Sequence, residues 1–211
     1  MKIAAPQASK PRGRPLSFDR DKALDSAMHV FWQRGYEAAS IAELTAAMGI
    51  TAPSLYTAFG DKERLFLEAI ERYVLGPASG FPRALEEETT AHGAVQRFLE
   101  EAAEELTRPC HPRGCMVVMA ATNCSEASAH IQAALAKRRA AGDAAIRERI
   151  ERGVQERELP ADTDTAALAG FYSTVYQGMS MQAKDGASHA ALLATAHAAM
   201  RAWPATTKET A

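Results

Sequence analysis

The sequence predicts an all-α protein. Only 7% of its 211 residues are aromatic and alanine is abundant, which favours helices over a β-sandwich. Apolar residues recur at helical spacing, and cap residues and glycines divide them into segments. The hydrophobic content of 47% and the net charge of −2 exclude disorder as the dominant state. They also exclude a uniformly basic coat, so any contact with nucleic acid has to be local.

The first predicted helix begins near Asp19 and ends at Arg34-Gly35. Its apolar residues have the i, i+3, i+4, i+7 spacing of one helix face: Leu24, Ala27, Met28 and Phe31. A second helix begins at Ser40, because Ser40 and Glu43 have the spacing of a capping box. Gly49 ends this helix and allows a tight turn.

A third helix follows at once, with Thr51 as N-cap, Pro53 in its first turn and Gly60 after its end. Asp61 begins a fourth helix, whose apolar residues are Leu65, Phe66, Ala69, Ile70 and Tyr73. The helix, turn and helix between residues 40 and 59 form a helix-turn-helix pattern. Its predicted inward residues pack on Met28 and Phe31 and are Ile41, Leu44, Ile50, Leu55 and Phe59. A generic αα-hairpin is the alternative, but the outward face of the third helix is polar and free of acid, as contact with phosphates requires.

Further helices follow a linker at residues 76–82, which contains Gly76-Pro77 and Gly80-Phe81-Pro82. One helix carries an apolar stripe from Val95 to Leu106, and a long one carries a stripe from Ile131 to Val154. We interpret the cations of the long helix as a solvated, ion-paired outer face: Lys137, Arg138, Arg139, Arg147 and Arg149. The last two helices, which include the uncharged segment 165–183, have almost no charge. That segment is too polar to span a membrane. Because two consecutive helices with almost no charge need more cover than one small domain supplies, we expect them to form a homodimer interface rather than to be buried within one monomer.

Residues 35–70, GYEAASIAELTAAMGITAPSLYTAFGDKERLFLEAI, resemble the DNA-binding segment of the tetracycline-repressor (TetR/AcrR) family of transcription regulators. The resemblance covers roughly residues 19–73. It implies three N-terminal helices that bind DNA and a larger C-terminal helical domain that dimerises and binds a ligand. Most members are repressors that leave the operator when a small molecule binds. Because a dimer presents two recognition helices, we expect a palindromic operator. We therefore expect a basic N-terminal arm at 1–17, a helix-turn-helix domain at 18–75 and an effector-binding and dimerisation domain at 76–211.

The resemblance also assigns the DNA contacts. It implies phosphate contacts by Ser40, Thr51, Tyr56 and Lys62. The base-facing residues would be Ala52, Pro53, Ser54 and Thr57. Because no Arg, Asn or Gln is among them, we expect readout by thymine methyl groups, one or two hydroxyls and DNA shape.

The N-terminal arm carries Lys2, Lys10, Arg12 and Arg14 and no acid. Pro11-Arg12-Gly13-Arg14-Pro15 resembles the core of an AT-hook, in which an extended Arg-Gly-Arg lies in a narrow minor groove. We therefore expect Arg12 and Arg14 to add DNA contacts, the alternative being a solubilising tail.

Candidate ligand-binding residues are apolar or neutral side chains of the C-terminal helices: Phe98, Met116, Met119, Asn123, Phe171, Tyr172, Tyr176 and Met179. Because none is charged, the set predicts an uncharged hydrophobic or aromatic effector. Ordinary core packing is the alternative for each residue.

The three cysteines, Cys110, Cys115 and Cys124, are an odd number without a disulfide pattern, and no signal peptide is evident, so we expect a reducing cytoplasm. A thiol sensor at Cys115, activated by His111 and Arg113, is the alternative to a bound effector. A metal site would draw on Cys110, His111, Cys115, Cys124 and His130, but this spacing matches no zinc template. With no catalytic constellation and no phosphate loop, we expect neither an enzyme nor a cofactor.

Overall fold

The computed structural model describes residues 18–76 and 81–204. These residues form helices and no strands, which confirms the predicted all-α class. The helices are α1 (Arg20–Arg34), α2 (Ile41–Met48), α3 (Ala52–Phe59), α4 (Lys62–Leu75), α5 (Phe81–Glu87), α6 (Ala91–Glu105), α7 (Met116–Met119), α8 (Ala129–Gln155), α9 (Thr165–Lys184) and α10 (His189–Met200), with a 3-10 turn η2 (Glu126–Ser128) before α8. None of the described helices has the length and hydropathy needed to span a membrane.

The local signals at the helix ends are confirmed for α2 and α3. The Ser40 hydroxyl accepts from the amide of Glu43, and the Glu43 carboxylate accepts from the amide of Ser40, both at 3.1 Å, so the capping box is complete. Gly49 ends α2 at φ 66°, a left-handed conformation that glycine adopts without strain. Thr51 is the N-cap of α3. These caps set the turn that places α3 across the end of the N-terminal domain.

The predicted inward face of the helix-turn-helix is confirmed. Leu44, Leu55 and Phe59 are buried, while Ile41 and Ile50 are half-buried against the same core. Phe31 of α1 lies at the centre, where its ring meets that of Phe66 edge-on at 5.0 Å. The burial of this apolar face gives three short helices a stability that they would lack in isolation.

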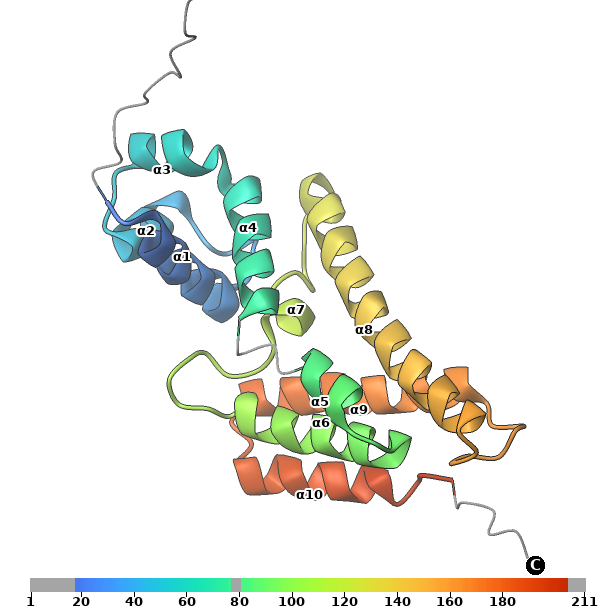
Figure 1. The fold of residues 1–211 in the computed structure, drawn as a ribbon. Coiled ribbons are helices and arrows are strands. Elements are labelled where there is room, and N and C mark those ends of the chain that lie inside the picture. The colour runs from blue at the N-terminus through green and yellow to red at the C-terminus, as the bar shows by residue number, and fades with distance from the viewer. Residues whose placement is uncertain (1–17, 77–80, 205–211) are drawn as a thin grey trace, which may run out of the picture.

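The C-terminal helices pack together, with α10 in contact with both α6 and α9, and with the long α8 running obliquely beside them and packing on α9 (Figure 1). The predicted stripe of the long helix is confirmed at Ile131, Leu135, Ile146 and Ile150, which are buried. The predicted linker is shorter than expected, because α5 begins at Phe81. Pro82 is compatible with that helix since proline in a first turn removes no intrahelical hydrogen bond.

The helix α4 runs from the end of α3 towards the C-terminal helices (Figure 1). Its last turns and the four-residue α7 lie at the junction of the two parts of the chain, beside α8. Through α4, the N-terminal helices are therefore connected to the C-terminal core by a continuous helix.

Candidate DNA-binding surface and internal cavity

The outward face of α3 carries the predicted DNA contacts. Thr51, Pro53, Tyr56 and Thr57 are exposed, and Tyr56 retains half of its accessible surface. Ala52 and Ser54 are half-buried on the same short helix. Figure 1 shows α3 at the end of the N-terminal domain that faces away from α6, α9 and α10. The helix is thus free to enter a groove of DNA without interference from the C-terminal layers.

The threonine and serine hydroxyls of this face are already engaged within α3. Thr51 Oγ1 and Ser54 Oγ share a hydrogen bond of 2.9 Å, and Thr57 Oγ1 donates to the carbonyl of Pro53 at 2.8 Å. Thr57 therefore offers a base an acceptor oxygen and a methyl group rather than a free donor. This geometry fits the sparse readout that the sequence predicts, in which methyl contacts matter more than paired hydrogen bonds.

Ser40 and Lys62 lie beside α3 but are held by partners within the protein. The Ser40 hydroxyl donates to the Glu43 carboxylate at 3.0 Å. The Lys62 ammonium lies 4.6 Å above the Tyr36 ring and donates to the carbonyl of Glu37 at 3.3 Å. Burial lowers the pKa of Lys62. A phosphate contact by either side chain would have to replace or extend these bonds.

The N-terminal domain is not basic. Residues 18–76 contain six Lys and Arg against nine Asp and Glu. Most of the six cations are paired: Arg20 with Glu68, Lys22 with Asp19, Arg34 with Glu43, Arg64 with Asp61, and Arg72 with Asp21 and Asp25. Arg12 and Arg14 lie outside the described residues. The charge that phosphates require is therefore concentrated in the sequence before residue 18.

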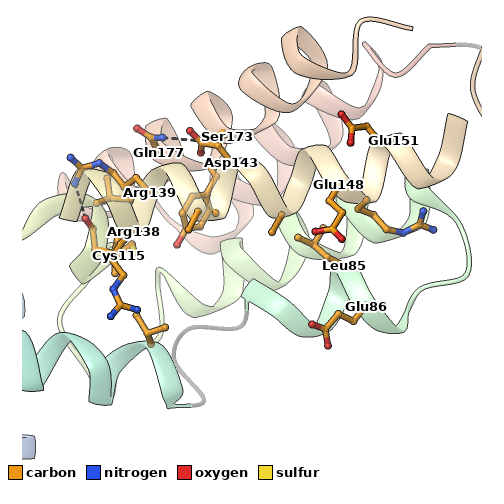
Figure 2. A pocket seen from close by; sticks show the side chains of 18 of the residues that line it. Leu85, Glu86, Cys115, Arg138, Arg139, Asp143, Glu148, Glu151, Ser173 and Gln177 are labelled. Carbon is orange, nitrogen blue, oxygen red and sulfur yellow. Dashed lines mark hydrogen bonds between the residues drawn. The ribbon is translucent and has the colours of Figure 1, made fainter. Parts of the chain in front are cut away.

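A cavity of about 760 Å³ lies between α8 and the ends of α4, α5, α7 and α9. Figure 2 shows Cys115, Arg138 and Arg139 near one end and Leu85, Glu86 and Glu148 towards the other. Its walls are mixed in character. The apolar part contains Tyr73, Val74, Leu85, Cys115, Val117, Val118, Ala145 and Tyr176, and the charged part contains Glu86, Arg138, Arg139, Asp143, Glu148, Arg149, Glu151 and Arg152.

Of the eight predicted ligand-binding residues, the cavity brings only Tyr176 into its wall. Phe98 lies behind it, with its ring 5.1 Å from the Tyr176 ring. Met116, Tyr172 and Met179 are buried in the helical core, and Met119 is half-buried. Asn123 and Phe171 are exposed. These seven residues do not form the lining, because most of them face between helices instead of towards α8.

The charged residues of α8 that line the cavity are not predicted from the sequence, because cations on a long helix are typical of a face exposed to solvent. Arg149 contradicts that interpretation, since it is only 3% exposed. A signal is present in the sequence: position 149 lies three residues after Ile146 and seven after Gly142, on the apolar stripe itself.

Cys115 lies in the cavity wall at the start of α7 and is buried. Its amide donates to Ser180 Oγ at 2.8 Å, and the Tyr73 hydroxyl donates to its sulfur at 3.4 Å. The pKa values of Tyr73 and Tyr176 are both raised well above the usual value. Burial is the larger cause, and the charge interaction with the nearby Cys115 is the second.

The two side chains expected to activate Cys115 point to other partners. His111 pairs with Glu105 at 2.8 Å and stacks on Trp32, and Arg113 donates to the carbonyl of Ala187. Cys110 is exposed, and burial raises the pKa of the half-buried Cys124. Within the described residues, no three His, Cys, Asp or Glu side chains are grouped as metal ligands.

The helix α7 is anchored to the N-terminal domain at both ends. The Trp32 indole N–H donates to the carbonyl of Gly114 at 2.9 Å, and the amide of Tyr36 donates to the carbonyl of Ala120 at 2.7 Å. A separate contact joins α4 to α8, where Glu63 pairs with His130 at 2.8 Å and Glu71 with Arg138. The walls of the cavity are therefore attached to the helices that carry the α2–α3 surface.

Comparisons with known proteins agree with this architecture. The family model described as "Bacterial regulatory proteins, tetR family" matches residues 23–69, and "Tetracyclin repressor-like, C-terminal domain" matches residues 92–200. The HTH-type transcriptional repressor ComR of Escherichia coli (strain K12) is 37% identical over 196 residues, covering 92% of this chain and 93% of that protein. The HTH-type transcriptional repressor BdcR of the same strain is 31% identical, covering 89% of this chain and 90% of that protein.

A solved structure of a TetR family regulator has the same fold as this chain. A cysteine mutant of the TetR family transcriptional regulator CifR, complexed with a 26 bp double-strand operator DNA, superposes with a TM-score of 0.88. It is 46% identical in sequence, and the match covers 90% of this chain and all of that chain.

Proposed function

Because this chain belongs to the tetR family of bacterial regulatory proteins, we propose that it is a transcriptional repressor released from a palindromic operator by a small molecule. The single observation that carries the proposal is the path from the cavity to α3. Tyr73 and Val74 of α4 line the cavity, and the same helix begins directly after α3. A ligand that moved the end of α4 would change the position of the surface that reads DNA.

We take residues 18–75 as the DNA-binding domain and residues 76–211 as the domain for effector binding and dimerisation. The two family matches, at 23–69 and 92–200, fall within these limits. The same division separates the α2–α3 surface from most of the cavity wall.

Dimerisation is expected through α9 and α10. Phe171 and Met181 of α9 are large apolar side chains left 42% and 47% exposed. The exposed residues of α10 include four small ones, Ala190, Ala191, Ala194 and Ala198. An apolar, small-residue face of this kind is suited to close helix packing against a second copy. In a twofold dimer, the two α3 helices would read half-sites of a palindrome.

The basic arm is proposed to supply electrostatic affinity that the described N-terminal domain cannot. Deleting residues 1–15 removes Lys2, Lys10, Arg12 and Arg14, and should weaken operator binding and reduce the slope of log K against log salt by roughly two to four for each arm of the dimer. Equal affinity and slope for the full and truncated chains would contradict a role for the arm. A loss of affinity confined to sites flanked by A·T pairs would support minor-groove entry.

The proposal is tested by operator mapping with the full-length protein. Gel shifts against its own promoter region, titrated with salt, should reveal one sequence-preferring site, and footprinting should locate two symmetric half-sites. Tyr56→Ala should weaken binding to that site about ten- to hundredfold if the hydroxyl contacts phosphate, because a hydrogen bond to a charged group contributes about 1.5–3 kcal/mol. Glu104→Gln is the control, since Glu104 is exposed on α6, outside both the DNA-binding domain and the proposed dimer face. Binding without sequence preference at low salt would refute the proposal.

A second candidate is a repressor that responds through the thiol of Cys115. It is favoured by the place of Cys115 in the cavity wall, where it meets Tyr73. The solved CifR structures are themselves described as cysteine mutants. Cys115→Ser distinguishes the candidates: a thiol mechanism requires alkylation of Cys115 in the native protein and a loss of response in the variant. A variant that still responds, in a protein whose Cys115 resists alkylation, excludes the thiol as the switch.

A further inference from the structure

Arg149 is the only Asp, Glu, Lys or Arg that is buried among the residues the structure describes. Its side chain is 2% exposed and lies on the inward stripe of α8 between Ile146 and Ile150. Removing a guanidinium from water is costly unless its donors find acceptors. The surroundings of Arg149 therefore have to balance its charge.

The acceptors around Arg149 are few and distant. Its Nη2 donates one long hydrogen bond of 3.4 Å to the carbonyl of Glu88. The carboxylates of Glu156 and Glu158 lie 3.9 Å away, beyond hydrogen-bond distance. The Glu158 carboxylate is also committed elsewhere, since it accepts from the amide of Ala91 at 2.5 Å. The Nε and Nη1 atoms of Arg149 are buried without a hydrogen-bond partner.

The electrostatic environment of Arg149 is also unfavourable. Burial, and then the neighbouring Arg152, lowers the pKa of Arg149, and the opposing effects of Glu158 and Glu156 do not cancel this shift. The two acids therefore leave the positive charge only partly compensated. An additional anion at this position would complete both the charge balance and the hydrogen bonds.

The other charged groups of the cavity are either partnered or in contact with water. Arg138 pairs with Glu71, Arg139 donates to the carbonyl of Val117, and Arg152 is exposed to water. Ser173 donates to Asp143, and Arg147 donates to Glu151. The remaining carboxylates, Glu86 and Glu148, are on exposed residues. Arg149 differs from all of them in being both buried and short of acceptors.

The cavity extends from the level of Arg149 along α8 to the level of Arg139 and α7. Ten residues separate these two arginines, which corresponds to about 15 Å along a helix. Between these levels lie apolar groups, with Ala145 on α8, Leu85 on α5 and Tyr176 on α9. Cys115 and Val117 of α7 close the far end. A ligand that followed this path would have a charged end at Arg149 and an apolar body.

We propose that the cavity binds an elongated amphipathic carboxylate, with its carboxylate on Arg149 and its apolar body extending towards Tyr176 and α7. This inference rests on the proposed function and specifies its effector class. It replaces the uncharged effector expected from the sequence. The body of the ligand would contact the end of α4 and the helix that Trp32 and Tyr36 anchor, and its arrival there would be transmitted to α3.

Binding is tested with three probes of one chain length below their critical micelle concentrations: dodecanoate, dodecanol and dodecylamine. Dodecanoate should bind the full-length dimer, measured by calorimetry and by a rise in Tm, and bind more tightly than the other two. Arg149→Gln should weaken dodecanoate binding by about ten- to hundredfold, as expected for losing a charge-assisted hydrogen-bond pair, and should leave dodecanol unaffected. Lys137→Gln is the control, because it removes one exposed positive charge from the same helix.

Ligand-free stability provides a second readout. If Arg149 is kept for a ligand, Arg149→Met should unfold at the same Tm as wild type or higher, because replacing a poorly paired buried charge with an apolar group is neutral or favourable. A large fall in Tm would instead assign Arg149 to a structural ion pair with Glu156 and Glu158. Equal binding of dodecanoate by wild type and Arg149→Gln, or preferential binding of dodecylamine, would overturn the proposal.

The operator assay is performed without probe on the same preparations. Intact operator binding combined with no dodecanoate binding refutes this inference and leaves the proposed repressor function standing. Dodecanoate binding through Arg149 without any sequence-preferring DNA binding refutes the proposed function instead.

Discussion

Replacing Trp32 by phenylalanine tests the connection between α1 and α7. The Trp32 side chain is buried, meets Tyr73 edge-on at 4.8 Å and donates its indole N–H to the carbonyl of Gly114 at 2.9 Å. Phenylalanine keeps most of the aromatic contact and removes the donor, so the Gly114 carbonyl is left without this bond. An unsatisfied buried group costs about 1–3 kcal/mol. For a chain of this size, each kcal/mol lowers Tm by about 2–4 °C, so the expected fall is roughly 2–12 °C.

The assay is urea and thermal unfolding at a fixed protein concentration, because the Tm of a dimer depends on concentration. Trp203→Phe is the matched control. Trp203 packs on Tyr172 at 5.6 Å, and no indole hydrogen bond is found for it among the described residues. An unfolding free energy for Trp32→Phe equal to that of wild type, or a loss no larger than that of the control, would refute the assigned role of the indole bond. If the bond also transmits effector binding, the variant should bind operator but release less of it when effector is added.

Three further changes have definite expected outcomes. Gly114→Ala should destabilise the fold by about 1–3 kcal/mol in urea unfolding, since Gly114 has φ 82° and an added Cβ would lie 2.9 Å from the carbonyl oxygen of Ser180. Glu71→Lys should change operator affinity in a gel shift while costing no more than about 1 kcal/mol of stability, and Arg138→Glu in the same chain should restore it. Burial raises the pKa of Tyr172 to about 12, so the unfolded chain loses its tyrosine proton first and stability falls as the pH rises above about 10. Tyr172→Phe should flatten part of that decline in unfolding midpoints measured at alkaline pH, and an unchanged slope would show that Tyr172 does not cause it.

The N-terminal domain is predictable from sequence because local signals determine it. Ser40 and Thr51 mark helix starts through side-chain hydrogen bonds a few residues away, and Gly49 marks a turn through its own backbone freedom. The apolar spacing then specifies which face turns inward. Each of these signals acts within one or two turns of helix, so no knowledge of distant contacts is needed.

The cavity is not predictable in this way, because its wall is assembled from five helices. In the sequence, aromatic and methionine residues are the natural candidates for lining a ligand cavity. Tyr172 and Met179 are instead buried in the helical core and do not reach the cavity wall. Which face of α9 meets α8 is decided by long-range packing, and no spacing rule within α9 encodes it. A charge within an apolar stripe, as at Arg149, is the more informative pattern, because a buried polar group has to be satisfied by something nearby.

The shortest α-helix of the described chain, α7, contacts both the N-terminal domain and the cavity. Four residues are too few for a stable isolated helix, so α7 owes its conformation to its neighbours. Those neighbours are the N-terminal domain, through Trp32 and Tyr36, and the cavity, through Cys115 and Val117. A ligand that repacks the cavity therefore acts on an element with little stability of its own. Since the same element holds α1 in place, a small displacement at the cavity wall has a direct structural route to the DNA-binding helices.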